Sequence, residues 1–410
     1  MGMKASNAIA TFFKYFVLIL VGLILGAILG IAVPQATGIA ILGDVFVSAL
    51  KAIAPLLVFF LVISSLCNAG KSHGGVIKTV IILYMFSTVL AAVIAVFASM
   101  AFPVKMTLAN AATDTSAPQG IVEVLNNLLL NVVANPVSSL VNANYVGILM
   151  WAVLLGLAFR AADKMTKKVL ADVADGISMV VTWIINLAPF GIFGLVFNTV
   201  STNGLDIFTT YGKLLLLLVG CMLFIYFVTN PLLVYWCIRQ NPYPLIFQCL
   251  KRSALTAFFT RSSAANIPVN MKVCEEMGLD RDTYSVTIPL GATINMDGAA
   301  ITITVMTMAT AFTLGIHVDI PTAIILSLLA ALSACGASGV AGGSLLLIPM
   351  ACSLFGISDD ISMQVVAVGF IIGVVQDSVE TALNSSSDLL LSASAEFRQW
   401  RLEGKEIKFK

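Results

Sequence analysis

Three carboxylates lie close together near the C-terminal end of the chain, in the stretch QDSVETALNSSSD. At about 100° per residue, the polar residues of this stretch follow a spacing that places them on or beside one face of a helix. These residues are Asp377, Glu380, Thr381, Asn384 and Asp388. A stripe of carboxylate, amide and hydroxyl oxygens can bind a cation or an organic ammonium group.

The surrounding composition is that of a polytopic membrane protein. The 410 residues are 59% hydrophobic and only 10% charged, with a mean hydropathy of +1.00. Soluble domains carry about 25% charged residues. Apolar runs predict membrane helices near residues 12–33, 43–66, 76–102, 145–159, 177–200 and 212–238. A carboxylate that faces lipid costs at least about 2.5 kcal/mol, so the polar stripe must face a cavity, a cation or a partner.

Two later segments are interrupted in the middle by residues that do not suit a membrane helix. Residues 251–278 contain Arg261 and Pro268, and residues 321–356 contain the glycine-rich stretch CGASGVAGGS. Each apolar arm has about ten residues, or roughly 15 Å of helix, against a hydrocarbon core of about 30 Å. We therefore predict two re-entrant hairpins whose tips meet near the bilayer centre. The alternative is two irregular helix pairs that pack for structure alone.

Each predicted hairpin is followed by one long span with a polar break, at residues 287–305 and at residues 369–388. Because one span intervenes, the two hairpins enter from opposite sides, which predicts an inverted repeat. The predicted fold is an all-α polytopic membrane protein with eight transmembrane helices and two re-entrant hairpins. Paired interrupted segments of this kind are typical of a transporter site at the bilayer midplane.

Basic residues predict the orientation of the chain. With both termini in the cytoplasm, only Lys51, Lys105 and Lys213 would lie outside. The first apolar run is too long for a secretory signal and is expected to be a retained span of a multi-pass membrane protein. The seven cysteines form no CxxC pair and the chain has two histidines, which disfavours a zinc or redox site.

The predicted centre carries more negative than positive charge. It contains one cation, Arg261, and four carboxylates: Asp297, Asp377, Glu380 and Asp388. The stretch NMDG around Asp297 offers a carboxylate, an amide and unwound carbonyls, a hard-oxygen set that suits an alkali cation.

The remaining central groups suit an amino acid. Asp377 is available for an ammonium group, and the Ser262–Ser263 tip lies at a helix N-terminus, which suits a carboxylate. An amino acid carries both groups. A channel or an intramembrane enzyme is disfavoured, because the polar residues concentrate at the centre and no histidine lies near the central serines to act as a base. No nucleic-acid partner is expected.

Four motifs in this order resemble those of the dicarboxylate/amino acid:cation symporters, the glutamate transporter homologues, and most closely their bacterial sodium-coupled serine/threonine branch. They are TRSSAANIP at 260–268, PLGATINMDG at 289–298, the second hairpin tip at 336–344, and the spacing D-x-x-E-T-x-x-N-x-x-x-D from Asp377. The resemblance implies a homotrimer in a lipid bilayer, in which a fixed scaffold holds a moving transport domain.

The implied division has five parts. It assigns scaffold helices 1 and 2 to residues 1–75, transport-domain helix 3 to 76–102, an extracellular loop to 103–144, scaffold helices 4 and 5 to 145–205, and transport-domain helices 6 to 8 with both hairpins to 206–410.

The resemblance also implies the site residues. The substrate would be bound by Ser262, Ser263, Met296, Val340, Gly342, Asp377, Glu380, Thr381 and Asn384. Co-transported sodium ions would occupy three places: Gly291, Asn295, Asn384 and Asp388; Thr293, Ala334, Cys335 and Ala337; and Tyr84, Ser87, Thr88, Asn295 and Asp297. Ser87 and Thr88 could instead bond to carbonyls of their own helix. Arg261 would offset Asp377 or Glu380, or contact the neighbouring hairpin backbone.

Two departures from the acidic-substrate members bear on specificity. Those members have an arginine at the position of Glu380 and a threonine at the position of Ala299. Both changes remove recognition of a side-chain carboxylate, and Glu380 adds repulsion. We therefore expect sodium-coupled import of serine and threonine, in which Glu380 could accept a hydrogen bond from a substrate hydroxyl. The alternative is a sodium- or proton-coupled symporter of acidic amino acids or dicarboxylates.

Overall fold

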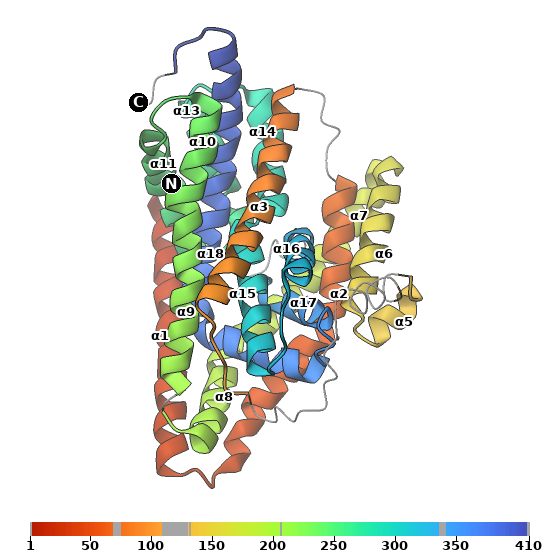
Figure 1. The fold of residues 1–410 in the computed structure, drawn as a ribbon, viewed down its shortest axis with the longest axis vertical. Helices are drawn as coiled ribbons and strands as arrows, with labels where there is room; N and C mark the ends of the chain where they lie inside the picture. The colour runs from red at the N-terminus through yellow and green to blue at the C-terminus, as the bar shows by residue number, and fades with distance from the viewer. Residues whose placement is uncertain are drawn as a thin grey trace.

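The computed structural model describes residues 2–68, 75–108, 130, 133–205, 207–335 and 342–407. Over these residues every regular element is a helix, arranged as shown in Figure 1. The first half contains α1 (Gly2–Ala32), α2 (Ile41–Asn68), α3 (Gly75–Ala101), α5 (Pro136–Val141), α6 (Tyr145–Ala158), α7 (Lys164–Asn186), α8 (Ala188–Asn203), α9 (Ile207–Phe224) and α10 (Asn230–Ile238). The second half contains α11 (Tyr243–Cys249), α12 (Leu255–Thr260), α13 (Ser263–Glu276), α14 (Arg281–Ile294), α15 (Asp297–Thr313), α16 (Ile320–Ala334), α17 (Ile348–Ser353) and α18 (Asp359–Leu402).

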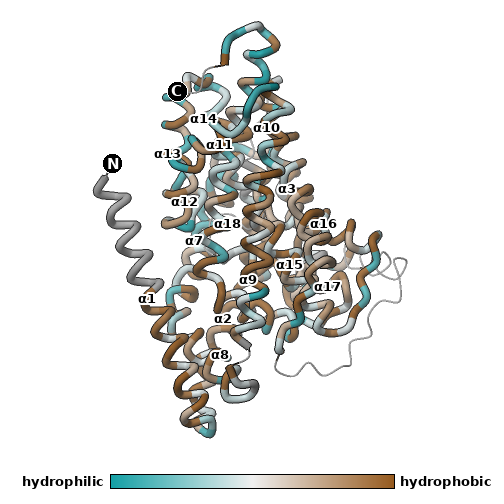
Figure 2. Tube along the Cα trace, turned by 60° about the vertical axis from the view of Figure 1, so that its left-hand side comes forward, coloured by the Kyte–Doolittle hydropathy of each residue, from teal (hydrophilic) through white to brown (hydrophobic). Residues whose placement is uncertain are grey.

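Several of these helices are long and apolar enough to cross a membrane. Six stretches of the described residues meet this condition, and they begin at Thr37, Gly75, Lys164, Phe208, Arg281 and Asp359. Figure 2 shows hydrophobic residues along α3 and α9 and hydrophilic ones towards the end of the molecule that carries α13 and α14. The chain is therefore an all-helical, multi-pass membrane protein.

One predicted span is divided in two. The apolar run 177–200 crosses the junction between α7 and α8, where Pro189 stands in the first turn of α8. Proline lacks an N–H and restricts the residue before it, so the chain bends here.

Helices α1 and α8 pack backbone to backbone. Three glycines of α1, Gly22, Gly26 and Gly30, are spaced by four residues, and a Cβ added to any of them would meet a backbone oxygen of α8. At Gly26 that atom would lie 2.6 Å from the carbonyl oxygen of Phe193. Small residues at this spacing permit the close approach of membrane helices, where van der Waals contact supplies much of the stability.

The first interrupted segment folds back on itself. Between α11 and α12 the chain forms a π-helical turn, Leu250–Ala254, and α12 ends at Arg261, whose φ of 50° is left-handed. On the returning arm the Asn266 amide donates to Ser253 Oγ at 3.0 Å, and Glu276 pairs with Arg252. The two arms are thus antiparallel, with Arg261 at the turn.

The second interrupted segment begins with α16 and returns through a 3-10 turn, Leu345–Leu347, into α17. Asp319 caps α16 by accepting from the backbone N–H of Thr322 at 3.0 Å, and hydrogen bonding to Thr322 holds the pKa of the Asp319 carboxyl below its ordinary value. In Figure 1 α11 and α13 lie towards the upper end of the view, and α17 lies in the lower half. The two interrupted segments therefore approach the centre from opposite ends.

The two spans with predicted polar breaks differ from each other. The first is broken, because α14 ends at Ile294 and α15 begins at Asp297. The second is not: α18 continues without interruption from Asp359 to Leu402. The prediction of a break in residues 369–388 is wrong in this sense, since serine, asparagine and aspartate here lie on a continuous helix.

The packing of α1 on α8 gives a first test. We expect Gly26→Ala to lower the unfolding temperature in detergent by several degrees, because overpacking against a rigid backbone costs about 1–3 kcal/mol. The control is Gly176→Ala on α7, where an added Cβ meets nothing within 4 Å. An unchanged unfolding temperature in Gly26→Ala would contradict the close contact.

Candidate substrate and cation site

Both hairpin tips reach the same carboxylate of α18. Arg261 Nε donates to Asp377 Oδ2 at 2.6 Å, and the backbone N–H of Gly342 donates to Asp377 Oδ1 at 3.0 Å. The Asp377 side chain is only 5% exposed, and that of Arg261 is 12% exposed. Asp377 is one of the three partners considered for Arg261 in the sequence.

Glu380, one turn further along α18, is surrounded by donors. Its Oε2 accepts from Thr302 Oγ1 at 2.7 Å, from Ser344 Oγ at 2.9 Å and from Gln376 Nε2 at 2.5 Å. These donors come from α15, from the second hairpin and from α18 itself. Their convergence compensates a carboxylate that is almost completely buried.

The unwound stretch between α14 and α15 is held by Asn384. Its Oδ1 accepts from the backbone N–H of Gly298 at 2.7 Å, and its Nδ2 approaches Met296 Sδ at 3.5 Å. A side chain at Gly298 would collide with α18, since an added Cβ would lie 2.9 Å from Glu380 Cγ. The glycine is thus required for α15 to begin against this face of α18.

A second cluster joins the break between α14 and α15 to Asp388, at the C-terminal end of the row of polar residues on α18. Asn295 Nδ2 donates to Asp388 Oδ1 at 2.9 Å and approaches Ser387 Oγ at 3.2 Å. Asn295 Oδ1 and Asp388 Oδ2 are buried and have no hydrogen-bond partner among the residues that the structure describes. Beside them, a Cβ added to Gly291 would lie 2.8 Å from Asp388 Oδ1. Two unpaired buried oxygens, one of them on a carboxylate, are the donor set that a desolvated hard cation prefers.

Asp297, at the start of α15, faces α3. Ser87 Oγ donates to its Oδ2 at 2.7 Å, and Thr88 Oγ1 lies 3.2 Å from its Oδ1. Thr88 Oγ1 also lies 3.0 Å from the carbonyl of Tyr84, so the contact within its own helix, considered from the sequence, is present as well. The hydroxyl of Tyr84 donates to the backbone carbonyl of Asp388 at 2.8 Å, which joins this cluster to the previous one.

The other predicted residues are less closely engaged. Thr293 Oγ1 bonds to Leu290 O at 2.7 Å, Ala334 is fully buried, and Cys335 Sγ lies 4.0 Å from Ile294 O. Ser262 caps α13 through Ala265 N at 3.2 Å, Ser263 begins that helix, and Thr381 is buried on α18. Ala337 and Val340 lie outside the described residues.

Several polar residues of the site were not predicted. Thr302, Ser344 and Gln376 surround Glu380, and Asn230 Oδ1 lies 3.5 Å from Ser87 Oγ. Gln376 directly precedes Asp377, and Asn230 interrupts an apolar run, so each carried a signal in the sequence. Ser344 ends the predicted second hairpin tip, whereas Thr302 carried no signal, because threonine is common in apolar helices.

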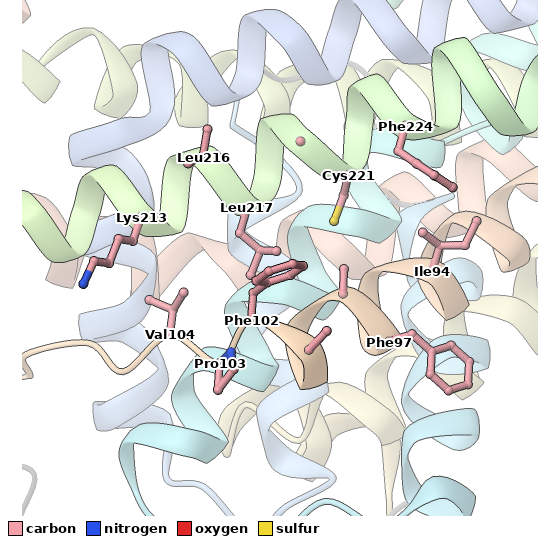
Figure 3. Close-up of a pocket in the computed structure, with 13 residues that line it drawn as sticks. Ile94, Phe97, Phe102, Pro103, Val104, Lys213, Leu216, Leu217, Cys221 and Phe224 are labelled. Carbon is pink, nitrogen blue, oxygen red and sulfur yellow. The ribbon is translucent and has the colours of Figure 1, made fainter.

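The space beside Asp377 is nearly closed. A cavity of about 10 Å³, room for about one water molecule, lies between Arg261, Gly342, Phe370 and Asp377. A far larger cavity of about 810 Å³ lies between α3 and α9, and its lining is apolar apart from Lys213, as Figure 3 shows. It contains no carboxylate and cannot compensate an ammonium group, so the small cavity beside Asp377 is the better candidate for a site that binds one.

Comparison with known proteins agrees with this chemistry. The sodium:dicarboxylate symporter family matches residues 16–396. The serine/threonine transporter SstT of Bifidobacterium adolescentis is 57% identical over 408 residues, covering 98% of this chain and 95% of that protein. Proteins of the same name from Streptococcus thermophilus and Streptococcus agalactiae are 56% and 58% identical, over 93% and 92% of this chain and 96% and 94% of their own lengths.

The two unpaired oxygens give a test of cation binding. A bound ion stabilises the folded state by about 2.7 kcal/mol at one hundred times its dissociation constant. We expect sodium, compared with an equal concentration of potassium, to raise the unfolding temperature of the wild-type protein in detergent. Asp388→Asn should lose most of this rise, because it removes the charge beside Asn295 Oδ1.

The matched control is Asp172→Asn, which neutralises an exposed carboxylate of α7 and should leave the sodium effect intact. A full sodium effect in Asp388→Asn would show that the unpaired oxygens do not bind the ion.

Proposed function

Because the chain belongs to the sodium:dicarboxylate symporter family, we propose that it imports serine and threonine together with sodium ions. Its relatives are named as transporters, so the chain is a transporter and not an enzyme. The observation that supports the substrate class most directly is the convergence of both hairpin tips on Asp377. A single buried carboxylate between two movable tips suits one ammonium group.

In this proposal the amino acid replaces contacts that the protein makes with itself. The substrate ammonium group binds Asp377 in place of the guanidinium of Arg261 and the N–H of Gly342. The substrate carboxylate lies at the N-terminus of α13, where Ser262 and Ser263 provide hydroxyl and backbone donors. Thr381, Asn384 and Met296 line the main-chain part, and Val340 covers the site with Gly342.

Sodium ions prepare the site before the substrate binds. One ion neutralises Asp388 beside Gly291, Asn295 and Asn384. A second neutralises Asp297 beside Tyr84, Ser87 and Thr88, and a third lies among Thr293, Ala334, Cys335 and Ala337. Because coupling of binding equilibria is reciprocal, the substrate raises sodium affinity by the same factor by which sodium raises substrate affinity. Each net positive charge that enters contributes about 2.3 kcal/mol per 100 mV of membrane potential.

Selectivity against acidic substrates follows from the residues around Asp377. A side-chain carboxylate would approach the carboxylate of Glu380, which repels it, and would find no guanidinium at that position of α18. Ala299, fully buried, offers no hydroxyl in its place. These features favour small neutral amino acids over aspartate, glutamate and dicarboxylates.

We further propose eight spans and two re-entrant hairpins in an inverted repeat, with both termini in the cytoplasm of a bacterial inner membrane. The spans are α1, α2, α3, α6, the run 177–200 across the junction of α7 and α8, α9 with α10, α14 with α15, and α18. The packing of α1 on α8, and of α2 on α6, α7 and α8, supports a scaffold distinct from a transport domain of the remaining helices. A homotrimer would hold three scaffolds together.

Uptake of labelled serine into proteoliposomes tests the proposed function. An inward sodium gradient should drive uptake and potassium should not. Threonine should compete strongly, and aspartate should compete weakly because Glu380 repels it. Strong competition by aspartate, or uptake driven by a proton gradient without sodium, would favour the alternative of an acidic-substrate or proton-coupled symporter.

The role of Asp377 is tested separately. Asp377→Asn should lower serine uptake about 10- to 100-fold, because a hydrogen bond to a charged group is worth about 1.5–3 kcal/mol. The control Ser378→Ala changes the next buried residue of α18, whose hydroxyl has no hydrogen-bond partner, and should transport normally. Asp377→Asn should keep the stabilisation by sodium that Asp388→Asn loses. Loss of both effects together would contradict separate ammonium and cation sites.

A further inference from the structure

We propose that Glu380 acts as a positioning residue: through Ser344 it holds the second hairpin against α18, and this contact persists when a substrate occupies Asp377. The part that concerns the substrate rests on the proposed function. The contact itself rests on the geometry around Glu380, which joins the hairpin tip to two long helices.

The hydrogen bonds of Glu380 place it behind the substrate cavity. Its Oε2 receives Ser344 Oγ at 2.9 Å, Thr302 Oγ1 at 2.7 Å and Gln376 Nε2 at 2.5 Å. All three donor side chains are at most 1% exposed. The small cavity beside Asp377 is lined by Gly342 and Leu345 but not by Glu380. Protein donors therefore occupy Oε2, one of the two oxygens of the Glu380 carboxylate.

The local backbone fixes Ser344 in this position. Gly342 has a φ of +72°, a left-handed conformation that glycine adopts without strain. The carbonyls of Gly342, Gly343 and Ser344 then accept from the N–H groups three residues later, at 3.1, 3.2 and 3.2 Å. Leu345 packs against Gly369 of α18, where an added Cβ would lie 2.6 Å from Leu345 Cδ2. This close approach brings the Ser344 hydroxyl within reach of Glu380.

Two hydrogen bonds thus join the described part of the hairpin tip to acidic residues of α18, and we expect only one of them to be replaced when a substrate binds. The bond from Gly342 N–H ends on Asp377, the carboxylate that must accept the substrate ammonium group. The bond from Ser344 ends on Glu380, which keeps Thr302 and Gln376 as partners whether or not a substrate is present. A bound substrate can replace Gly342 at Asp377, while the bond from Ser344 to Glu380 keeps the hairpin in the same position along α18.

Cys335 provides a native reporter for hairpin opening. It lies at the start of the tip and is partly exposed, whereas the other six cysteines are buried. We would measure the rate of N-ethylmaleimide modification at Cys335 by peptide mass spectrometry, in the full-length protein in detergent. Ser344→Ala should accelerate the modification about tenfold in the absence of sodium and serine.

The matched control is Ser327→Ala, a buried serine of the same hairpin whose hydroxyl bonds only to Ala323 O of its own helix, at 2.9 Å. It should change the rate less than twofold. Glu380→Gln should accelerate modification as well, and Ser344→Ala combined with Glu380→Gln should react no faster than the faster single variant. Sodium with serine should slow the wild-type reaction, while Ser344→Ala remains several-fold faster than wild type under the same conditions.

Equal rates for Ser344→Ala and wild type would overturn the proposal, as would additive effects of the two substitutions, because the serine would then not act through Glu380. Unfolding temperatures of all variants separate hairpin opening from general destabilisation. The substrate-free measurement needs no transport, so failure of sodium-driven serine uptake would leave the result on the Ser344 contact unaffected.

Discussion

The structure depends on the compensation of carboxylates that one unbroken helix carries through an apolar environment. Asp377, Glu380 and Asp388 lie on α18 and are at most 5% exposed. An uncompensated charge at this depth would be prohibitive, and an unwound helix would add unsatisfied backbone groups to the cost. The helix remains regular because other segments supply the partners. Irregular backbone is therefore found opposite α18, in the hairpin tips and in the break between α14 and α15.

Each irregular segment contributes a different kind of partner. The first tip brings a full positive charge, Arg261, to Asp377. The second tip brings the backbone N–H of Gly342 to Asp377 and the hydroxyl of Ser344 to Glu380. These neutral donors stabilise the carboxylates without adding a positive charge. The α14–α15 break brings the amide of Asn295, which uses its N–H₂ group on Asp388 and leaves its own oxygen unpaired. The first two arrangements are complete within the protein, and the third leaves Asn295 Oδ1 and Asp388 Oδ2 without a hydrogen-bond partner among the described residues.

The sequence predicted the parts that depend on spacing and composition. The polar stripe of α18, the turn at Arg261 and the break at Asn295 follow from helical periodicity and from residues that interrupt it. The predicted second break failed because Asn384 and its serine neighbours satisfy their polar groups without unwinding the helix. Thr302 could not be identified, since hydroxyls in apolar helices usually bond to their own backbone, and Ser344 was predicted only as part of a hairpin tip and not as a partner of Glu380. Only the fold brings both to one oxygen of Glu380.

The contrast between two kinds of helix contact explains which parts can move. Along α1 and α8, Gly22, Gly26 and Gly30 place backbone directly against backbone, so any sliding would create collisions at several positions at once. The tip of the second hairpin is instead joined to α18 by hydrogen bonds from Gly342 and Ser344, beside the packing of Leu345 on Gly369. Packed interfaces have discrete arrangements, whereas a few polar contacts can exchange partners at small cost. We therefore expect exchange of polar partners at the tips that compensate the carboxylates, while the glycine contact of α1 with α8 stays fixed.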